Sequence, residues 1–159
     1  MNEIRFEANN LADTDRLGRC LASVIPDGTT VALIGTLGSG KTYLVQAIAE
    51  ACGIDRRHVV SPTFVLCQPY HGQRLLFHMD AYRIADDDEF MELGPDEYFD
   101  SDGVTLIEWA DRVQNCLPTE RIEIHIEVKE KNTREFRITS TSSSLAPVLE
   151  QIAARLASG

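Results

Sequence analysis

Long hydrophobic runs are missing from this sequence of 159 residues. No stretch approaches the roughly 20 apolar residues that a membrane-spanning helix needs. The opening residues, MNEIRFEANN, lack the basic and apolar regions of a secretion signal. The cysteines include no C-x-x-C pair, so neither a disulfide framework nor a zinc site is indicated. We expect a cytoplasmic protein that forms one domain, residues 1–159, around one core.

Positive charge is scarce, with 15 basic residues against 25 acidic ones and a net charge of −10. Residues 86–103 contain nine acidic residues and no basic residue, so they carry most of this imbalance. No basic stripe elsewhere compensates, and we therefore expect no strong direct binding to nucleic acid. The acidic segment has two interpretations. It is a solvated helix and loop, or it is a docking surface for a basic partner protein.

The distribution of apolar residues predicts an α/β fold. Residues 29–35 (TTVALIG) read as a continuous apolar strand of the kind that is buried on both faces, and residues 104–108 (VTLIE) read as another buried strand. Residues 3–8, 121–128 and 133–140 alternate between apolar and polar, which predicts strands with one solvated face. Residues 63–80 predict two strands joined by a turn at His71-Gly72. Helices are predicted over 13–25, 41–52, 87–93 and 145–156, the first with Asp13 or Thr14 as its N-cap.

A phosphate-binding loop is the strongest motif of the chain. Residues 35–42, GTLGSGKT, match G-x-x-x-x-G-K-[ST] between a predicted buried strand and a predicted helix. In this motif backbone amides hold phosphate oxygens, the lysine reaches the β- and γ-phosphates, and the final hydroxyl binds Mg²⁺. The expected nucleotide contacts in and beside the loop are Thr36, Leu37, Gly38, Ser39, Gly40, Lys41, Thr42 and Tyr43.

This loop specifies the fold class and narrows the cofactors. We predict an α/β, P-loop NTPase-like three-layer fold whose mixed sheet is parallel near the loop and antiparallel at the hairpins. The chain has no N-K-x-D segment of the kind that reads guanine, so elimination favours ATP with Mg²⁺ over GTP.

Two carboxylates follow predicted strands, where functional groups of open α/β sheets gather. Glu108 ends VTLI and Asp80 follows LLFHM. Because VTLIE reads as a central strand beside the loop strand, we assign Glu108, together with Thr42, to Mg²⁺. Asp80 is then the candidate that orients or deprotonates the attacking water. The alternatives are a solvent-facing Glu108, and an Asp80 that only caps a turn through the backbone or Arg83.

Other candidates are open to two interpretations. Ser61 and Thr63 lie in SPTF, which is either a γ-phosphate sensor or a plain strand entry. His78 is either a supporting donor to the site or a core histidine. Trp109, the only tryptophan, is either core or interface filler, or it closes the site or anchors a partner.

Base recognition has the weakest signal in the sequence. Asn10 and Arg134 are candidates only because the two ends of the chain can fold back toward the loop.

These pieces in this order resemble the bacterial TsaE (formerly YjeE) family, the ATPases of tRNA threonylcarbamoyladenosine biosynthesis. The resemblance covers residues 30–128 and rests on six ordered motifs: GTLGSGKT, SPTF, HMDAYRI, ELG…EYF, LIEWADRV and a late LP. It implies a P-loop ATPase that works with TsaB-like and TsaD-like partner proteins. In that family, ATP hydrolysis supports turnover of the complex. The resemblance further implies catalytic roles for Lys41, Asp80 and Trp109.

The chain departs from the family pattern at two positions of the loop. Thr36 replaces a common acidic residue, and Tyr43 replaces a common threonine. Thr42 keeps the hydroxyl for the metal, so the assignment stands. A small-molecule or nucleoside kinase built on the same loop is the alternative function, and a nucleotide-dependent switch with negligible turnover is a third.

Overall fold

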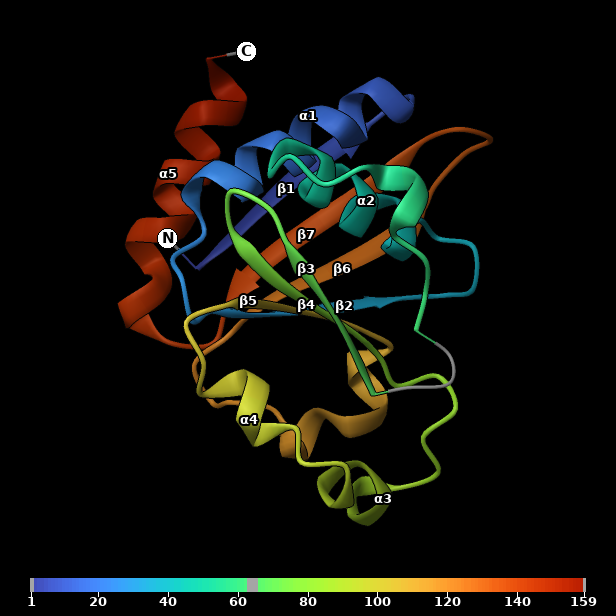
Figure 1. Cartoon of the computed structure of the whole chain (residues 1–159). Helices are drawn as coiled ribbons and strands as arrows, with labels where there is room; N and C mark the ends of the chain where they lie inside the picture. The colour runs from blue at the N-terminus through green and yellow to red at the C-terminus, as the bar shows by residue number, and fades with distance from the viewer. Residues whose placement is uncertain (1, 63–65, 159) are drawn as a thin grey trace.

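The computed structural model describes residues 2–62 and 66–158, in which a mixed β-sheet lies between two helical layers (Figure 1). Within these residues the sheet has seven strands in the order β1-β7-β6-β2-β5-β4-β3. The inner strands β6, β2, β5 and β4 are mutually parallel, and the pairs β3/β4, β6/β7 and β1/β7 are antiparallel. The strands are β1 (Glu3–Ala8), β2 (Thr30–Gly35), β3 (Cys67–His71), β4 (Leu75–Asp80), β5 (Val104–Glu108), β6 (Ile122–Val128) and β7 (Arg134–Ser140).

Helices cover both faces of the sheet, which makes the three predicted layers (Figure 1). One layer consists of α1 (Leu11–Val24), α2 (Lys41–Ala51) and α5 (Ala146–Ala157). The other consists of α3 (Asp87–Glu92), α4 (Asp96–Phe99) and the 3₁₀ segment η2 (Ala110–Cys116). Two further 3₁₀ turns are η1 (Arg56–His58) and η3 (Ser143–Leu145). Every described helix is too short or too polar to cross a lipid bilayer.

The apolar strands bury side chains on both faces because successive residues of a strand point in opposite directions. In β5, Leu106 belongs to the core under α1, α2 and α5. Its neighbour Ile107 belongs to the second core, with Phe90 of α3 and Phe99 of α4. The predicted mixed sheet and the two-sided burial of VTLIE are therefore confirmed.

The order of the strands brings the predicted functional groups to one edge. β2 is parallel to β5, and β5 is parallel to β4, so the carboxyl ends of all three meet. The register pairs Leu33 with Glu108 and Glu108 with Asp80. Both carboxylates therefore lie at the edge of the sheet where the glycine-rich loop leaves β2.

The predicted start of the first helix was wrong. Its N-cap is Asn10, whose side-chain oxygen accepts a hydrogen bond from the backbone N–H of Asp13 at 2.8 Å. Asn is a favoured N-cap because this bond satisfies a free donor of the first turn. The helix therefore begins at Leu11, and both Asp13 and Thr14 lie inside it. The first predicted strand of 63–80 also differs, since β3 begins at Cys67 and residues 63–65 lie outside the described part of the chain.

Candidate functional site

The loop between β2 and α2 has the conformation that glycine allows. Gly38 and Gly40 have φ angles of 78° and 111°, in the left-handed region that other residues avoid. Gly40 is the N-cap of α2, so the free N–H groups of the first turn open toward the loop. Backbone amides and a helix N-terminus together form a binding site for anionic oxygens. The loop between β2 and α2, together with the first turn of α2, thus forms a phosphate-binding site, which we call the phosphate cradle.

Lys41, the first residue of α2, is held inside this loop. Its ammonium group donates to the backbone oxygens of Gly35 at 2.7 Å and Thr36 at 2.9 Å. The side chain is 4% exposed, and burial lowers the pKa of Lys41, while the nearby carboxylates of Glu108, Asp111 and Asp80 oppose that shift. An ammonium group in this position can bind phosphate oxygens through charge-assisted hydrogen bonds.

Glu108 lies directly opposite the loop helix. The Thr42 hydroxyl contacts both of its carboxylate oxygens, at 2.8 Å and 2.9 Å. Glu108 is 2% exposed, which excludes the solvent-facing alternative. His78 of β4, fully buried, lies with Nε2 at 2.6 Å from the carboxylate and fixes its orientation. Of the two interpretations of His78, the structure therefore favours the supporting donor.

Asp80 uses both oxygens. One accepts the backbone N–H of Tyr82 at 2.8 Å, so the turn-capping interpretation describes one half of this carboxylate. The other accepts a hydrogen bond from the Ser61 hydroxyl. Asp80, Ser61 and Tyr82 all line a cavity of about 400 Å³ that also contains Lys41 and the loop glycines. The carboxylate thus reaches the space over the phosphate cradle.

Trp109 closes one side of that cavity. The Lys41 ammonium group lies 3.9 Å from the centre of the indole ring. Tyr82 packs against the indole with ring centres 4.9 Å apart, and the Arg112 guanidinium lies 5.7 Å from it. Trp109 has φ 58°, the only positive value of a non-glycine residue in the described chain. Strained backbone of this kind gathers at functional sites, and the position favours a role in closing the site.

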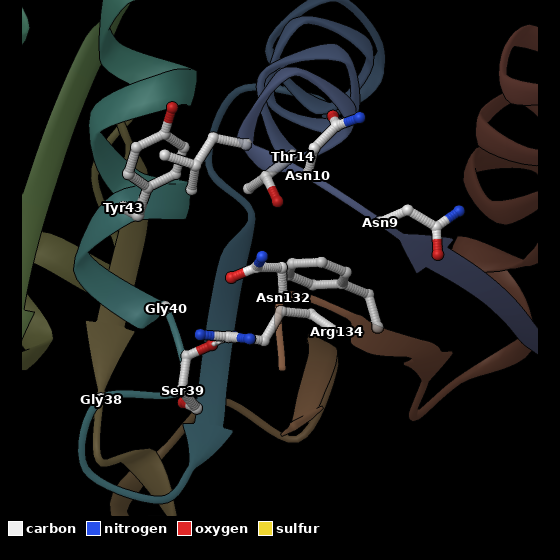
Figure 2. A pocket seen from close by; sticks show the side chains of 11 residues that line it. Asn9, Asn10, Thr14, Gly38, Ser39, Gly40, Tyr43, Asn132 and Arg134 are labelled. Atoms are coloured by element: carbon white, nitrogen blue, oxygen red, sulfur yellow. Dashed lines mark hydrogen bonds between the residues drawn. The ribbon is translucent and has the colours of Figure 1, made fainter. Parts of the chain in front are cut away.

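A second cavity, of about 590 Å³, lies on the other side of the loop (Figure 2). Figure 2 shows Tyr43 from α2, Thr14 from α1, Asn10 from the N-cap of α1, and Asn132 and Arg134 from the hairpin side around one space. Gly38, Gly40 and Tyr43 line this cavity and the phosphate cavity alike. The two cavities therefore form adjoining compartments: the larger one, with amide and aromatic groups, suits a base and ribose, and the smaller one, beside Lys41, suits phosphates.

Asn10 and Arg134, the two base-recognition candidates, both line the larger cavity. Arg134 also donates from Nε to the backbone oxygen of Ser39 at 3.0 Å and so supports the loop. Sequence reasoning missed further lining residues, which are Asn9, Leu11, Thr14, Asn132 and Phe136. Asn132 lies two residues before Arg134, so the same argument would have found it. Thr14 had its own signal, a polar residue on the apolar face of a helix.

Tyr43 is braced from outside the site. Its hydroxyl group contacts an Asp15 carboxylate oxygen at 3.2 Å, and Arg56 donates to the same hydroxyl at 3.1 Å. Arg56 also bonds Asp15 at 2.8 Å, which completes a triangle between α1, α2 and η1. This residue, a departure from the family pattern, is therefore a fixed wall shared by both cavities.

The remaining predicted contacts are placed differently. Thr36 and Leu37 are both exposed, and Leu37 lines the phosphate cavity whereas Thr36 does not. Ser39 is buried under the loop and lines the larger cavity. Thr63 lies outside the described residues.

The residues present fit a magnesium ion together with a phosphate. Among the described residues, no group of three His, Cys, Asp or Glu side chains is arranged to hold a metal alone. Mg²⁺ usually binds one or two protein oxygens and takes its other ligands from water and substrate phosphates. The hydroxyl of Thr42 and the carboxylate of Glu108 supply oxygens of that kind beside the cradle.

The sheet order, the loop and the carboxylates at the strand ends define a P-loop protein of the α/β class. Comparison with known proteins makes this specific. The family model described as "Threonylcarbamoyl adenosine biosynthesis protein TsaE" matches residues 8–136, and the chain belongs to this family.

Individual relatives agree over most of their length. The chain is 35% identical over 153 residues to the tRNA threonylcarbamoyladenosine biosynthesis protein TsaE of Bacillus subtilis, covering 96% of this chain and 95% of that one. It is 36% identical over 135 residues to the protein of the same name from Treponema pallidum, covering 85% and 99%. The crystal structure of Bacillus subtilis YdiB superposes with a TM-score of 0.81 at 30% identity, covering 96% of this chain and 95% of that one.

Proposed function

We propose that this protein is a magnesium-dependent ATPase that supports threonylcarbamoyladenosine modification of tRNA in the cytoplasm, as a subunit of a complex with TsaB-like and TsaD-like proteins. The observation that carries the proposal is the meeting of Lys41, Thr42, Glu108 and Asp80 around one phosphate cradle in a chain of the TsaE family. Family membership supports the pathway, and the geometry supports the chemistry.

The roles of the four side chains follow from their charge and position. Lys41 neutralises negative charge on the β- and γ-phosphates. Thr42 and Glu108 would hold Mg²⁺, which supplies charge neutralisation at the phosphate oxygens when it is bound. His78 keeps the Glu108 carboxylate facing the hydroxyl of Thr42. Each of these groups strengthens binding of a charged triphosphate.

Asp80 has a different task, because its second oxygen lies beside the Ser61 hydroxyl and faces the cavity. A carboxylate in this position orients a water molecule for attack on the γ-phosphorus. The water oxygen forms the new P–O bond, the bond to the β-phosphate oxygen breaks, and Asp80 takes the proton. Trp109 and Tyr82 shield the reacting atoms from bulk water.

The division between ATPase and kinase can be tested by following the γ-phosphate. We expect phosphate release that rises when the TsaB-like and TsaD-like partners are added. Labelled ATP, incubated with the protein alone, with partners, and with a pool of nucleosides and metabolites, separates the two functions. Transfer of label to a metabolite with no effect of the partners would reject the proposal in favour of the kinase.

The assignment of Glu108 to magnesium predicts a change in magnesium dependence. Glu108→Gln keeps the shape and an acceptor oxygen for Thr42, but removes the charge. We expect the magnesium concentration for half-maximal hydrolysis to rise by about tenfold, with a parallel loss of the magnesium-dependent gain in ADP affinity. The control is Glu120→Gln, an exposed acid outside the site. An unchanged magnesium titration in Glu108→Gln would move the metal to Asp80.

A further inference from the structure

A third cavity, of about 350 Å³, lies between α1 and α5 and is lined by three arginines. Arg16 and Arg19 come from α1, and Arg155 comes from α5. None of the residues that line it also lines the base or phosphate cavity. In Figure 1 α5 lies on the left of the molecule and the loop that joins β2 to α2 lies on the right, while α1 extends across the top between them. This arginine cavity is therefore separate from the proposed ATP site.

Helical spacing explains why these groups meet. Arg19 and Cys20 follow Arg16 by three and four residues, and Ser23 follows Cys20 and Arg19 by three and four, which places all of them on one stripe of α1. Buried apolar side chains of α1 such as Leu17 and Leu21 face the sheet, so this stripe borders α5 instead. The helical spacing thus places the positive charges of Arg16 and Arg19 together, beside Arg155 of α5.

The three guanidinium groups have no carboxylate partner among the described residues, and no Asp or Glu lines the cavity. Arg16 donates to the backbone oxygen of Leu156, and Arg155 donates to the Ser23 hydroxyl at 3.1 Å. Each guanidinium group has five N–H donors, so most donors of the cluster are unused. By contrast, ion pairs are formed by Arg5, Arg56, Arg57, Arg74, Arg121 and Arg137.

The contrast matters because the chain as a whole is strongly acidic, with a net charge of −10. Three like charges in one cavity repel each other, and a bound anion removes that repulsion. Cys20 adds no negative charge of its own. Burial raises the pKa of this thiol, although the charges of Arg155 and Arg16 oppose the shift, so it stays protonated at neutral pH.

We propose that the arginine cavity binds a phosphate group. Guanidinium groups bind phosphate oxygens in pairs of parallel hydrogen bonds. The Ser23 and Ser158 hydroxyls also line the cavity, but they donate to the backbone oxygens of Cys20 and Arg155, so the arginines supply the donors for the phosphate. The volume greatly exceeds the roughly 30 Å³ that one water molecule occupies, so a phosphate or pyrophosphate group fits. The phosphate belongs either to a small compound or to the phosphodiester chain of a nucleic acid.

The test is a calorimetric titration of the full chain with pyrophosphate at constant ionic strength. The site variant is Arg19→Gln with Arg155→Gln, since both side chains are exposed and the backbone bond of Arg16 is left intact. The control variant is Arg5→Gln with Arg57→Gln, which removes the same charge from exposed ion pairs elsewhere. Both variants keep the phosphate loop unchanged, so their difference reports the cavity alone.

We expect two classes of pyrophosphate site in the wild type and the control. One class is the phosphate loop, which depends on Lys41, and the other is the arginine cavity. In the site variant, pyrophosphate binding at the arginine cavity should weaken by about tenfold or disappear, because two charge-assisted contacts are lost. Competition by a single-stranded oligouridine, lost in the same variant, would identify the phosphodiester source, and absence of competition would identify a small phosphate compound. Equal pyrophosphate binding by all three proteins would overturn the proposal.

Discussion

Replacing Lys41 with alanine should abolish tight ATP binding. The ammonium group is almost fully buried within the loop, and it is already positioned by the carbonyl oxygens of Gly35 and Thr36. Loss of about two charge-assisted hydrogen bonds to phosphate weakens binding by roughly 100-fold or more. The measurement is the dissociation constant of ATP with Mg²⁺, obtained by calorimetry or by displacement of a fluorescent nucleotide.

Two further variants make this expectation specific. Lys41→Met keeps the aliphatic stem that packs beside Trp109, so it removes the charge with less disturbance of the loop. Lys131→Ala removes an exposed lysine from the β6–β7 turn and should bind ATP as the wild type does. The assignment fails if Lys41→Met and Lys131→Ala have the same ATP affinity while both unfold at the temperature of the wild type.

Asp80→Ala should slow hydrolysis by about 100-fold and leave the affinity for ATP nearly unchanged, since general bases typically contribute factors of this size. The reason is geometric: Asp80 reaches the cavity next to Ser61, whereas Lys41 and the loop amides carry the phosphate binding. Single-turnover phosphate release and a separate binding titration distinguish the two effects.

The backbone contact of Asp80 calls for a second variant. Asp80→Asn retains an oxygen that can accept the N–H of Tyr82, so the turn persists while the base is lost. Asp88→Ala, an exposed acid of α3, is the control of matched charge. If Asp80→Asn lowers ATP affinity as strongly as Lys41→Ala does, the separation of binding from hydrolysis is wrong.

Much of the fold could be predicted because local patterns and long-range pairing agree. VTLIE has no charged residue before its end, and such a strand is stable only between two covered faces. The same pattern predicted that VTLIE lies beside the strand that precedes the phosphate loop, and this placed Glu108 next to the loop. Elements without periodicity could not be found in this way. α4 has four residues and η2 consists of short 3₁₀ turns, so neither shows a repeating apolar face.

The site was less predictable, because side-chain contacts depend on packing that the sequence does not specify. The sequence left His78 as either a supporting donor or a core histidine, and only the pairing of β4 with β5 shows that its ring contacts Glu108. The brace of Tyr43 by Asp15 and Arg56 joins three elements far apart in the chain. No spacing rule connects them. Asn10 also illustrates the limit, since one residue is both a helix cap and part of the cavity wall.

The contact between Lys41 and Trp109 gives the molecule a built-in optical reporter. Indole emission responds to nearby charge and to solvent, and this chain has a single indole, with an ammonium group 3.9 Å from its centre. Any ligand that draws the ammonium group away from the Gly35 and Thr36 carbonyls also changes the surroundings of the chromophore. Occupancy of the phosphate cradle can therefore be followed in the unlabelled protein by its own fluorescence, alone or within a larger assembly whose other members lack tryptophan.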